Sequence, residues 1–304
     1  MNQVSPIRNV AVVTGGSDGI GKAIAHRFAA RGDEIFLVAR DPDKGKRAVE
    51  ELRTAAGRDG VHFLRADLSL MRDTARLAGE ITARIPRLHS LVLCAGIVRG
   101  ERVLTDEGIE SNFATNYLSR FVLTERLRTL LQETGMEGAA ARILVIGGAA
   151  TNGRIHYDDV NLGNNFGILR MVAQFCQAND LFVIEQARRL EAAGLSRRVT
   201  INTLKVGVVR TGIRNGFPGW LKLLVPILFD PLLSQTPEQI AASALPLLTD
   251  PVFEGANGRL FTHIRRFKPV EPGARTRDSR EGARLWAFSE GLVRRALSRT
   301  DPAR

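Results

Sequence analysis

The feature that most constrains this chain is a run of glycines between a short apolar segment and a helical one. The run reads Thr14-Gly15-Gly16-Ser17-Asp18-Gly19-Ile20-Gly21 and directly follows the apolar segment Val10–Val13. In such a motif Gly15 allows a tight turn, Gly19 lets the backbone approach a pyrophosphate, and Gly21 lets the helix pack closely on the strand. Free N–H groups at the helix start would face the phosphates. Because strand and helix both stand where the motif needs them, the sequence predicts a dinucleotide-binding turn.

Short apolar runs alternate with amphipathic segments along most of the 304 residues. The predicted strands are Val10–Thr14, Ile35–Ala39, Val61–Ala66, Ser90–Cys94, Ile143–Gly147 and Val199–Leu204, with a late strand near Arg259–Thr262 closing the sheet edge. The predicted helices are Lys22–Arg31, Lys44–Ala56, Met71–Arg84, Glu110–Leu131 and Val183–Ala193. This alternation is typical of βαβ units. We therefore expect an α/β fold: a Rossmann-type doubly wound parallel sheet of about seven strands, with helices on both faces.

No linker rich in Pro, Gly or Ser divides the chain. We predict one dinucleotide-binding domain over residues 1–265 and a C-terminal helical extension over residues 266–304. Thr236 followed by Pro237 predicts the start of a helix. The apolar segment at about 212–235 is interrupted by charged residues and prolines, so it does not predict a transmembrane span. It suggests a lid over a hydrophobic substrate, and the alternatives are a membrane-surface contact and simple packing on the sheet.

Composition and charge narrow the class of protein. The net charge of +11 comes mostly from Arg residues spread over the whole chain, without a dense basic run, so we expect no nucleic-acid partner. The two cysteines, Cys94 and Cys176, have no metal-ligand spacing and predict free thiols and no metal site. Residues 1–9 are polar and lack the apolar core of a signal peptide, which predicts a cytoplasmic protein.

The spacing of the glycine turn, T-G-x-x-x-G-x-G, resembles that of the short-chain dehydrogenase/reductase family. The resemblance continues along the chain. Asp67 and Leu68, which follow the third strand, look like the family's adenine contact. Ala95 and Gly96 resemble the end of its Asn-Ala-Gly motif, with Cys94 in place of Asn.

The resemblance covers nearly the whole chain, from about Arg8 to Val293. Asn116 matches the structural and catalytic Asn of the family's fourth crossover helix. The segment Leu285–Glu290 resembles the tail of the retinol-dehydrogenase-like branch. The family often dimerises through the helices that here carry Asn116 and Phe175, so the resemblance also implies a possible homodimer.

The resemblance implies a nicotinamide cofactor. An NAD site commonly has a carboxylate at the end of the second strand, for the ribose 2′-hydroxyl. Here Arg40 stands there, and a guanidinium suits a 2′-phosphate, although Asp41 follows it. We therefore predict NADP(H) rather than NAD(H). The cofactor-binding residues that the resemblance implies are Thr14, Gly15, Ser17, Asp18, Gly19, Ile20, Gly21, Arg40, Asp67, Leu68, Ala95, Gly96, Gly207 and Thr211.

The catalytic groups of the family are missing. In the family a Tyr exchanges a proton with the substrate oxygen, a Lys four residues later lowers the Tyr pKa, and a Ser binds the same oxygen. This chain has two tyrosines, and neither is followed by Lys four residues on. We match Gly148 to the Ser position, Phe175 to the Tyr position and Asn179 to the Lys position.

Three side chains remain as candidates for chemistry: Asn116, Tyr157 and Lys205. Tyr157 follows the fifth strand and either reaches the pocket or belongs to a packing loop. Lys205 ends the sixth strand and is either a surface lysine or a replacement cation. Asp180 points about 100° away from Asn179 around the helix, so we do not expect it to take part.

Four functions stay open on the sequence. The first is non-redox chemistry on a hydrophobic small molecule: a cyclisation, isomerisation or dehydration in which orientation supplies much of the rate. The second is NADPH-dependent hydride transfer to an activated carbonyl or iminium carbon. The third is a non-catalytic regulatory protein that binds NADP(H). The fourth is an ordinary dehydrogenase with a substitute acid such as Tyr157.

Overall fold

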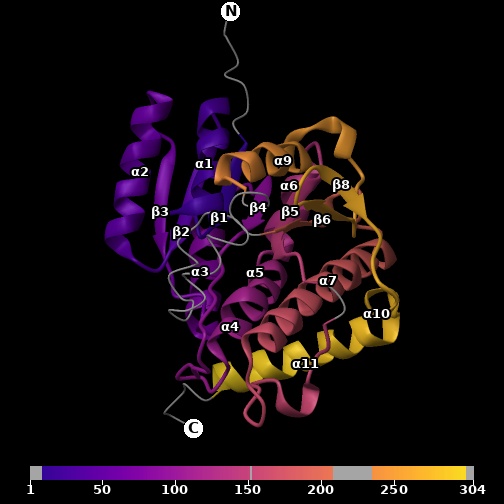
Figure 1. Cartoon of the computed structure of the whole chain (residues 1–304). Helices are drawn as coiled ribbons and strands as arrows, with labels where there is room; N and C mark the ends of the chain where they lie inside the picture. The colour runs from indigo at the N-terminus through magenta and orange to yellow at the C-terminus, as the bar shows by residue number, and fades with distance from the viewer. Residues whose placement is uncertain (1–8, 151–152, 208–234, 299–304) are drawn as a thin grey trace, which may run out of the picture.

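The computed structural model describes residues 9–150, 153–207 and 235–298, which form one sheet with helices on both faces (Figure 1). Eight strands lie in the order β3-β2-β1-β4-β5-β6-β7-β8. Neighbouring strands are parallel except β7 and β8, which are antiparallel. The predicted doubly wound parallel sheet is confirmed. The strands are β1 (Val10–Thr14), β2 (Glu34–Ala39), β3 (Val61–Arg65), β4 (Ser90–Leu93), β5 (Ala141–Gly148), β6 (Val199–Val206), β7 (Leu260–His263) and β8 (Phe267–Val270).

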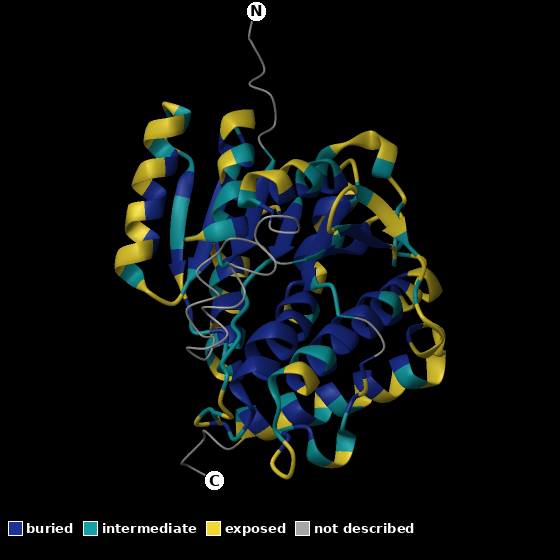
Figure 2. Cartoon of the chain, in the orientation of Figure 1, coloured by how far each residue is buried: buried dark blue, intermediate teal, exposed yellow. Residues whose placement is uncertain are grey.

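Two layers of helices bury the sheet between them (Figure 2). One face is covered by α1 (Gly19–Arg31), α2 (Pro42–Ala56) and α9 (Pro237–Thr249). The other face is covered by α3 (Met71–Arg84), α5 (Ser119–Arg126) and α7 (Ile168–Ala192), with α11 (Ser279–Ser298) lying against α7. The shorter helices and turns are α4 (Ser111–Phe113), η1 (Ala114–Leu118), α6 (Arg128–Met136), η2 (Tyr157–Asp159), η4 (Pro251–Phe253) and α10 (Ala274–Arg277).

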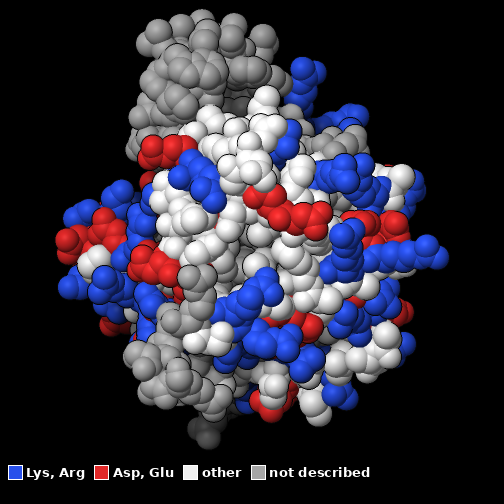
Figure 3. Space-filling model, turned by 90° about the horizontal axis from the view of Figure 1, so that it is seen from below, with Lys and Arg blue, Asp and Glu red and all other residues white. Residues whose placement is uncertain are grey.

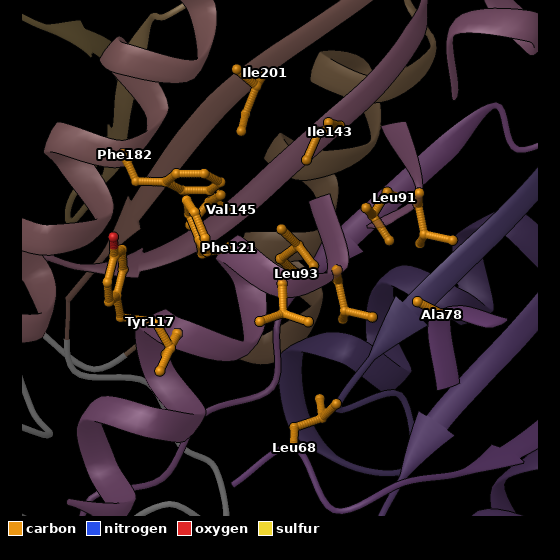
Figure 4. Close-up of a cluster of buried hydrophobic side chains, with 14 of the residues drawn as sticks. Leu68, Ala78, Leu91, Leu93, Tyr117, Phe121, Ile143, Val145, Phe182 and Ile201 are labelled. Carbon is orange, nitrogen blue, oxygen red and sulfur yellow. The ribbon is translucent and has the colours of Figure 1, made fainter. Parts of the chain in front are cut away.

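The larger core lies between the sheet and the layer of α3, α5 and α7. Alternate strand residues such as Leu93, Val145 and Ile201 point to this side, where they meet Phe121 of α5 and Phe182 of α7 (Figure 4). The intervening strand residues pack on α1 and α9. Strands buried on both faces need apolar residues at nearly every position, which explains why they appear in the sequence as continuous apolar runs.

The helix predicted after Thr236 is confirmed, with its cap. The Thr236 hydroxyl accepts a hydrogen bond from the Gln239 N–H at 3.3 Å, and the Gln239 side chain accepts one from the Thr236 N–H at 2.9 Å. Pro237 occupies the first helical turn, where its missing N–H costs nothing. This reciprocal capping box fixes the start of α9.

The helix predicted over Glu110–Leu131 is confirmed as helical, but it is irregular. The structure breaks this segment into α4, a π-helical turn η1, α5 and α6. Inside η1 the Asn116 side chain donates to the Asn112 carbonyl oxygen at 2.8 Å. That oxygen is the acceptor that the Asn116 backbone N–H would use in an α-helix, so the side chain competes with regular helix geometry.

The C-terminal part differs from the prediction in one respect. Residues 266–304 were expected to be helical, but β8 (Phe267–Val270) pairs with β7 and is the true edge of the sheet. Lys268 and Pro269 hid this strand in the sequence, because Pro is tolerated in a sheet only at an edge. Among the described residues no helix is both long and apolar enough to cross a membrane. The predicted lid at about 212–235 lies outside the described residues except for Gln235.

Candidate active site

The glycine turn has the geometry that the motif predicts. Gly15 adopts a φ of 68° and its N–H bonds the Val38 carbonyl oxygen of β2 at 2.8 Å. A Cβ at Gly15 would lie 2.9 Å from the Ala95 Cα, and one at Gly21 would collide with the Gly15 carbonyl oxygen. Both glycines are therefore needed for close approach: the first between β1 and the segment after β4, the second between helix α1 and its own entry turn.

Thr14 joins the ends of the two central strands. Its hydroxyl donates to the Val92 carbonyl oxygen at 3.2 Å and accepts from the N–H groups of Cys94 at 3.0 Å and Ala95 at 3.1 Å. The side chain is buried. The buried Thr14 side chain therefore holds in place the backbone that forms the pocket wall.

An open pocket of about 480 Å³ lies at the carboxyl ends of β1, β2 and β4. This is the crevice where a doubly wound sheet binds its ligand, because the strand order reverses between β1 and β4. Lys44, Cys94 and Arg99 also line it. The predicted cofactor residues that line the pocket are Gly15, Ser17, Asp18, Gly19, Ile20, Gly21, Arg40, Ala95 and Gly96.

The other predicted cofactor residues lie outside the pocket lining. Asp67 is 3.8 Å from the Arg40 guanidinium and also accepts from the Ser69 N–H. Leu68 is buried in the core, and Gly207 follows β6 next to Ile264. Thr211 lies outside the described residues.

At the β2 end of the pocket, Asp41 faces helix α2. Its carboxylate accepts hydrogen bonds from the N–H groups of Asp43 at 2.9 Å and Lys44 at 3.1 Å, so it caps the helix. These backbone hydrogen bonds, that of Lys44 first, hold the pKa of Asp41 below its usual value. Arg40 and Lys44 both line the pocket, and the Arg40 side chain is 62% exposed.

Asn116 supports the wall of the pocket. Its side-chain oxygen accepts from the Ile97 N–H at 3.1 Å, and its side-chain amide donates to the Ile97 carbonyl oxygen at 2.8 Å. This paired contact fixes the segment after β4 against the π-helical turn. Asn116 is buried, so its role in the described structure is to hold that segment.

Cys176 is the side chain that lies against Gly148. A Cβ built on Gly148 meets the Cys176 Sγ at 2.7 Å, and no other atom of the described residues comes within 4 Å of it apart from the chain neighbours. Cys176 and Val172 are one helical turn apart and share this side of α7. Phe175, which we matched to the Tyr position, is buried in the core. Burial raises the pKa of the Cys176 thiol to about 11, so the thiol is neutral.

Asn179 is fully engaged by the protein. Its side-chain amide donates to the carbonyl oxygens of Asn116 at 2.9 Å and Phe175 at 2.8 Å, and its oxygen accepts from Arg120 at 3.2 Å. The observed bonds use both of its N–H groups, so it has no donor left for a ligand.

Lys205 is a buried cation. It is 3% exposed and pairs with Asp180, which is 5% exposed. Its ammonium also lies 3.4 Å from the Ala150 carbonyl oxygen, two residues after Gly148. Burial raises the pKa of Asp180, and the nearby Lys205 partly offsets this. Asp180, which the sequence did not place among the candidates for chemistry, lies on the side of α7 that faces β6, where it meets Lys205.

Neither tyrosine reaches the pocket. The Tyr157 hydroxyl donates to Glu281 at 3.2 Å, and the Tyr157 ring packs on Phe288 of α11. Burial, and then the Glu281 carboxylate, raise the pKa of Tyr157. The Tyr117 hydroxyl lies 2.6 Å from the Ser289 hydroxyl in the core. The structure thus places the predicted substitute acid Tyr157 against α11 instead of at the glycine turn.

Sequence reasoning missed one more polar residue at the site, Arg120. It is buried on α5, one helical turn after Asn116, and contacts Ala95 and Asn179. An arginine inside the otherwise uncharged segment Phe113–Leu123 was the signal that pointed to it.

The comparisons agree with this geometry. A family model described as short chain dehydrogenase matches residues 9–157. Polyprenol dehydrogenase of Mus musculus is 31% identical over 284 residues, which cover 93% of this chain and 82% of that protein. Retinol dehydrogenase 13 of Homo sapiens is 31% identical over 291 residues, covering 93% and 83%.

Solved structures show the same fold. A putative uncharacterized protein from Mycobacterium paratuberculosis superposes with a TM-score of 0.72 at 24% identity, covering 94% of this chain and 93% of that one. A short chain dehydrogenase from Burkholderia cenocepacia in complex with NADP gives 0.65 at 22% identity, covering 85% and 97%. The relatives above and the glycine turn identify the family. The chain belongs to the short-chain dehydrogenase/reductase family, in its retinol-dehydrogenase-like branch.

Proposed function

We propose that this chain binds NADP(H) in the pocket at the glycine turn and is an oxidoreductase for a hydrophobic small molecule that works without a tyrosine acid. The observation that carries the proposal is the charge at the β2 end of the pocket. Arg40 and Lys44 line it, while the Asp41 carboxylate is held by the N-terminus of α2. A 2′-phosphate would meet two cations there, and a guanidinium binds phosphate with paired hydrogen bonds.

The residues present fit a dinucleotide. The space that a Cβ at Gly15 or Gly21 would fill is occupied by the closely approaching backbone, and the N-terminus of α1 opens toward the pocket. When bound, a nicotinamide exchanges a hydride with a substrate carbon. The chain's own contribution is to bind the dinucleotide across β2, β1 and β4 and to supply or accept a proton.

Lys205 is the proton carrier that we propose in place of the tyrosine. Its ammonium is held by Asp180 and lies near the Ala150 carbonyl oxygen, just beyond the strand end at Gly148. Proton transfer from a positioned side chain contributes about 10²–10⁴-fold to a rate. In a reduction, Lys205 would give its proton to the substrate oxygen or nitrogen and then take one back from water.

The substrate class is suggested by relatives. Two of them are named for polyprenol and retinol, which are both hydrophobic alcohols. We propose a lipophilic alcohol, or the carbonyl or imine derived from one. Nicotinamide absorbance, followed with a panel of such compounds, tests this proposal, and sustained turnover that is lost in Lys205→Met would support it. Unchanged turnover in Lys205→Met would remove Lys205 from the mechanism.

Non-redox chemistry is the second candidate. Both tyrosines form hydrogen bonds to residues of α11, and Gly148 faces a neutral thiol, so neither provides the acid that the family uses. A cyclisation, isomerisation or dehydration would then depend on orientation in the pocket. Conversion of a lipophilic substrate without any change in nicotinamide absorbance would favour it. Tight NADPH binding with no conversion of any substrate would favour a regulatory role.

The preference for NADP(H) has its own test. Titration with NADPH and NADH, followed by nicotinamide fluorescence, should show tighter binding of NADPH. Arg40→Ala should weaken NADPH binding about tenfold, because one charge-assisted contact to phosphate is lost, and should leave NADH binding unchanged. Arg47→Ala is the matched control, since Arg47 is exposed on α2 but does not line the pocket. Equal binding of NADH and NADPH to the wild type would contradict the preference.

A further inference from the structure

Two buried cations lie beside the candidate active site, and they differ in their counter-ions. Lys205 is paired with the carboxylate of Asp180. Arg120 is 5% exposed, and none of the carboxylates that the structure describes lies within ion-pair distance of it. Burial of a charge without a counter-ion is costly, so such residues mark places where charge has a use.

Among the described residues, Arg120 is held only by neutral acceptors. One terminal nitrogen donates to the Asn179 side-chain oxygen at 3.2 Å, and the other donates to the Ala95 carbonyl oxygen at 3.0 Å. Its Nε is buried and has no hydrogen-bond partner among the described residues. Ala95 itself lines the pocket, so the guanidinium lies directly behind the pocket wall.

The titratable groups around Arg120 in the described part of the chain leave its charge uncompensated. Cys94 after β4 and Cys176 on α7 act on Arg120 directly, and Asp180 on α7 and Lys205 on β6 are neighbours of Cys176. Burial raises the pKa of the Cys94 thiol to about 12 and that of Cys176 to about 11, so both thiols are neutral near pH 7. Asp180 and Lys205 balance each other. Burial lowers the pKa of Arg120 to about 10, which leaves it protonated at the same pH.

The sheet order indicates which half of a dinucleotide meets this charge. Arg40 follows β2, the glycine turn follows β1, and Ala95 follows β4, and these strands are consecutive neighbours in the sheet. If the adenosine phosphate were held at Arg40 and the pyrophosphate at the turn, the nicotinamide half would lie on the side of Ala95. Arg120 lies behind that part of the wall.

We propose that the fixed positive charge of Arg120 makes this site bind NADPH more tightly than NADP⁺. The inference rests on the proposed binding of NADP(H). The two forms differ at the nicotinamide ring, which is positively charged in NADP⁺ and neutral in NADPH. A buried cation behind the wall repels the oxidised ring and leaves the reduced ring unaffected, while both forms gain equally from the phosphate contacts.

Direct binding measurements test this inference without any turnover. NADPH is titrated by its fluorescence, and NADP⁺ is measured by displacement of NADPH. The wild type should bind NADPH about fivefold or more tightly than NADP⁺. Arg120→Gln should bring the two dissociation constants within about twofold of each other, and Arg120→Lys should keep the wild-type ratio because it keeps the charge.

Arg142→Gln is the matched control. Arg142 is also buried, but it lies at the opposite end of β5 and donates to the Asp250 carbonyl oxygen at 2.8 Å. Its loss should leave the ratio of the two dissociation constants unchanged. The wild-type ratio should also persist in high salt, because salt screens buried charges much less than exposed ones.

The outcomes separate this inference from the proposed function. If neither nucleotide binds the wild type, the proposed function is wrong and the inference falls with it. If both bind equally well, or if Arg120→Gln keeps the ratio, the inference is overturned while NADP(H) binding stands. Should Arg120→Gln fail to fold, the wild type decides: a ratio that disappears in high salt would assign the preference to exposed cations and overturn the role of Arg120.

Discussion

Asp180 and Lys205 keep two charges inside the core, where each depends on the other. Breaking a buried ion pair leaves one uncompensated charge, which costs about 3–5 kcal/mol. Asp180→Asn should therefore lower the free energy of unfolding by about that amount, as measured by urea denaturation followed by far-ultraviolet circular dichroism.

The control for this variant removes both charges. Asp180→Leu combined with Lys205→Met leaves no buried ion, and replacing a buried pair by apolar residues is often neutral in stability. The double variant should be more stable than Asp180→Asn alone. Equal losses in the two proteins would show that the pair does not act as a unit.

The two thiols differ from reactive cysteines in their surroundings. Burial raises the pKa of Cys94 to about 12 and of Cys176 to about 11, and the thiolate is the form that reacts. A raised thiol pKa means that the folded chain binds more protons than the unfolded chain above about pH 8.5, so this contribution to stability is lost as pH rises through the folded pKa values.

The low reactivity of the two thiols can be measured by alkylation with iodoacetamide at about pH 8, read by mass spectrometry. The folded protein should stay unmodified at Cys176 and react slowly at Cys94, which lines the pocket. The same reagent in denaturing urea should modify both thiols. Rapid modification of Cys176 in the folded state would show that α7 opens readily.

At the scale of elements, the glycine turn depends on backbone contact between α1 and β1. Gly21→Ala should abolish NADPH binding, because its Cβ would collide with the Gly15 carbonyl oxygen and push the turn out of shape. The control is Gly79→Ala on α3, where nothing lies within 4 Å of the new Cβ. That change should raise stability by about 0.4–1 kcal/mol.

Fluorescence titration with NADPH and far-ultraviolet circular dichroism would check both variants. Gly21→Ala should keep the helical signal of the wild type while it loses the titration. Wild-type affinity in Gly21→Ala would mean that the turn can shift without cost, and would weaken the assignment of the pocket.

The elements that the sequence predicted are those decided by local chemistry. The glycine turn and the start of α9 at Thr236 each depend on residues within a few positions of one another, and both were predicted. Arg120 was missed because its partners Ala95 and Asn179 are 25 and 59 positions away. The position of Tyr157 was left open for the same reason, since its partner Glu281 is 124 positions away.

The contacts around Gly148 could be identified only from the structure. The sequence count excluded a Tyr-x-x-x-Lys motif outright, but it could not show which residue of α7 faces Gly148. In the structure the Cys176 thiol lies nearest to Gly148, and Phe175, one residue earlier, is buried in the core. Neighbouring residues on a helix point about 100° apart, so only the folded chain shows which of them faces the end of the strand.

For the molecule as a whole, helix α11 changes the expectation of a dimer. The helices that the family often uses for dimerisation have no exposed residue over 111–124 and 174–183. Trp286 of α11 packs on Phe121 at 5.0 Å between ring centroids and lies under the Arg189 guanidinium at 4.0 Å. On the face of the molecule seen in Figure 3, basic and acidic side chains are interspersed.

We therefore expect a monomer in solution. Size-exclusion chromatography with light scattering should give the mass of a single chain, with and without NADPH. A dimer through the buried stretches 111–124 and 174–183 would require α11 to move away. A dimer whose mass persists after Trp286→Ala loosens α11 would point to a different surface.

Helix α11 also carries or contacts side chains that absorb in the near ultraviolet. One of the two tryptophans, Trp286, belongs to it, and both tyrosines hydrogen-bond to it through Ser289 and Glu281. Near-ultraviolet circular dichroism of this protein will therefore report the docking of one helix, largely independently of the nucleotide pocket. A thermal melt that begins earlier in the near ultraviolet than in the far ultraviolet would record that helix leaving before the sheet unfolds.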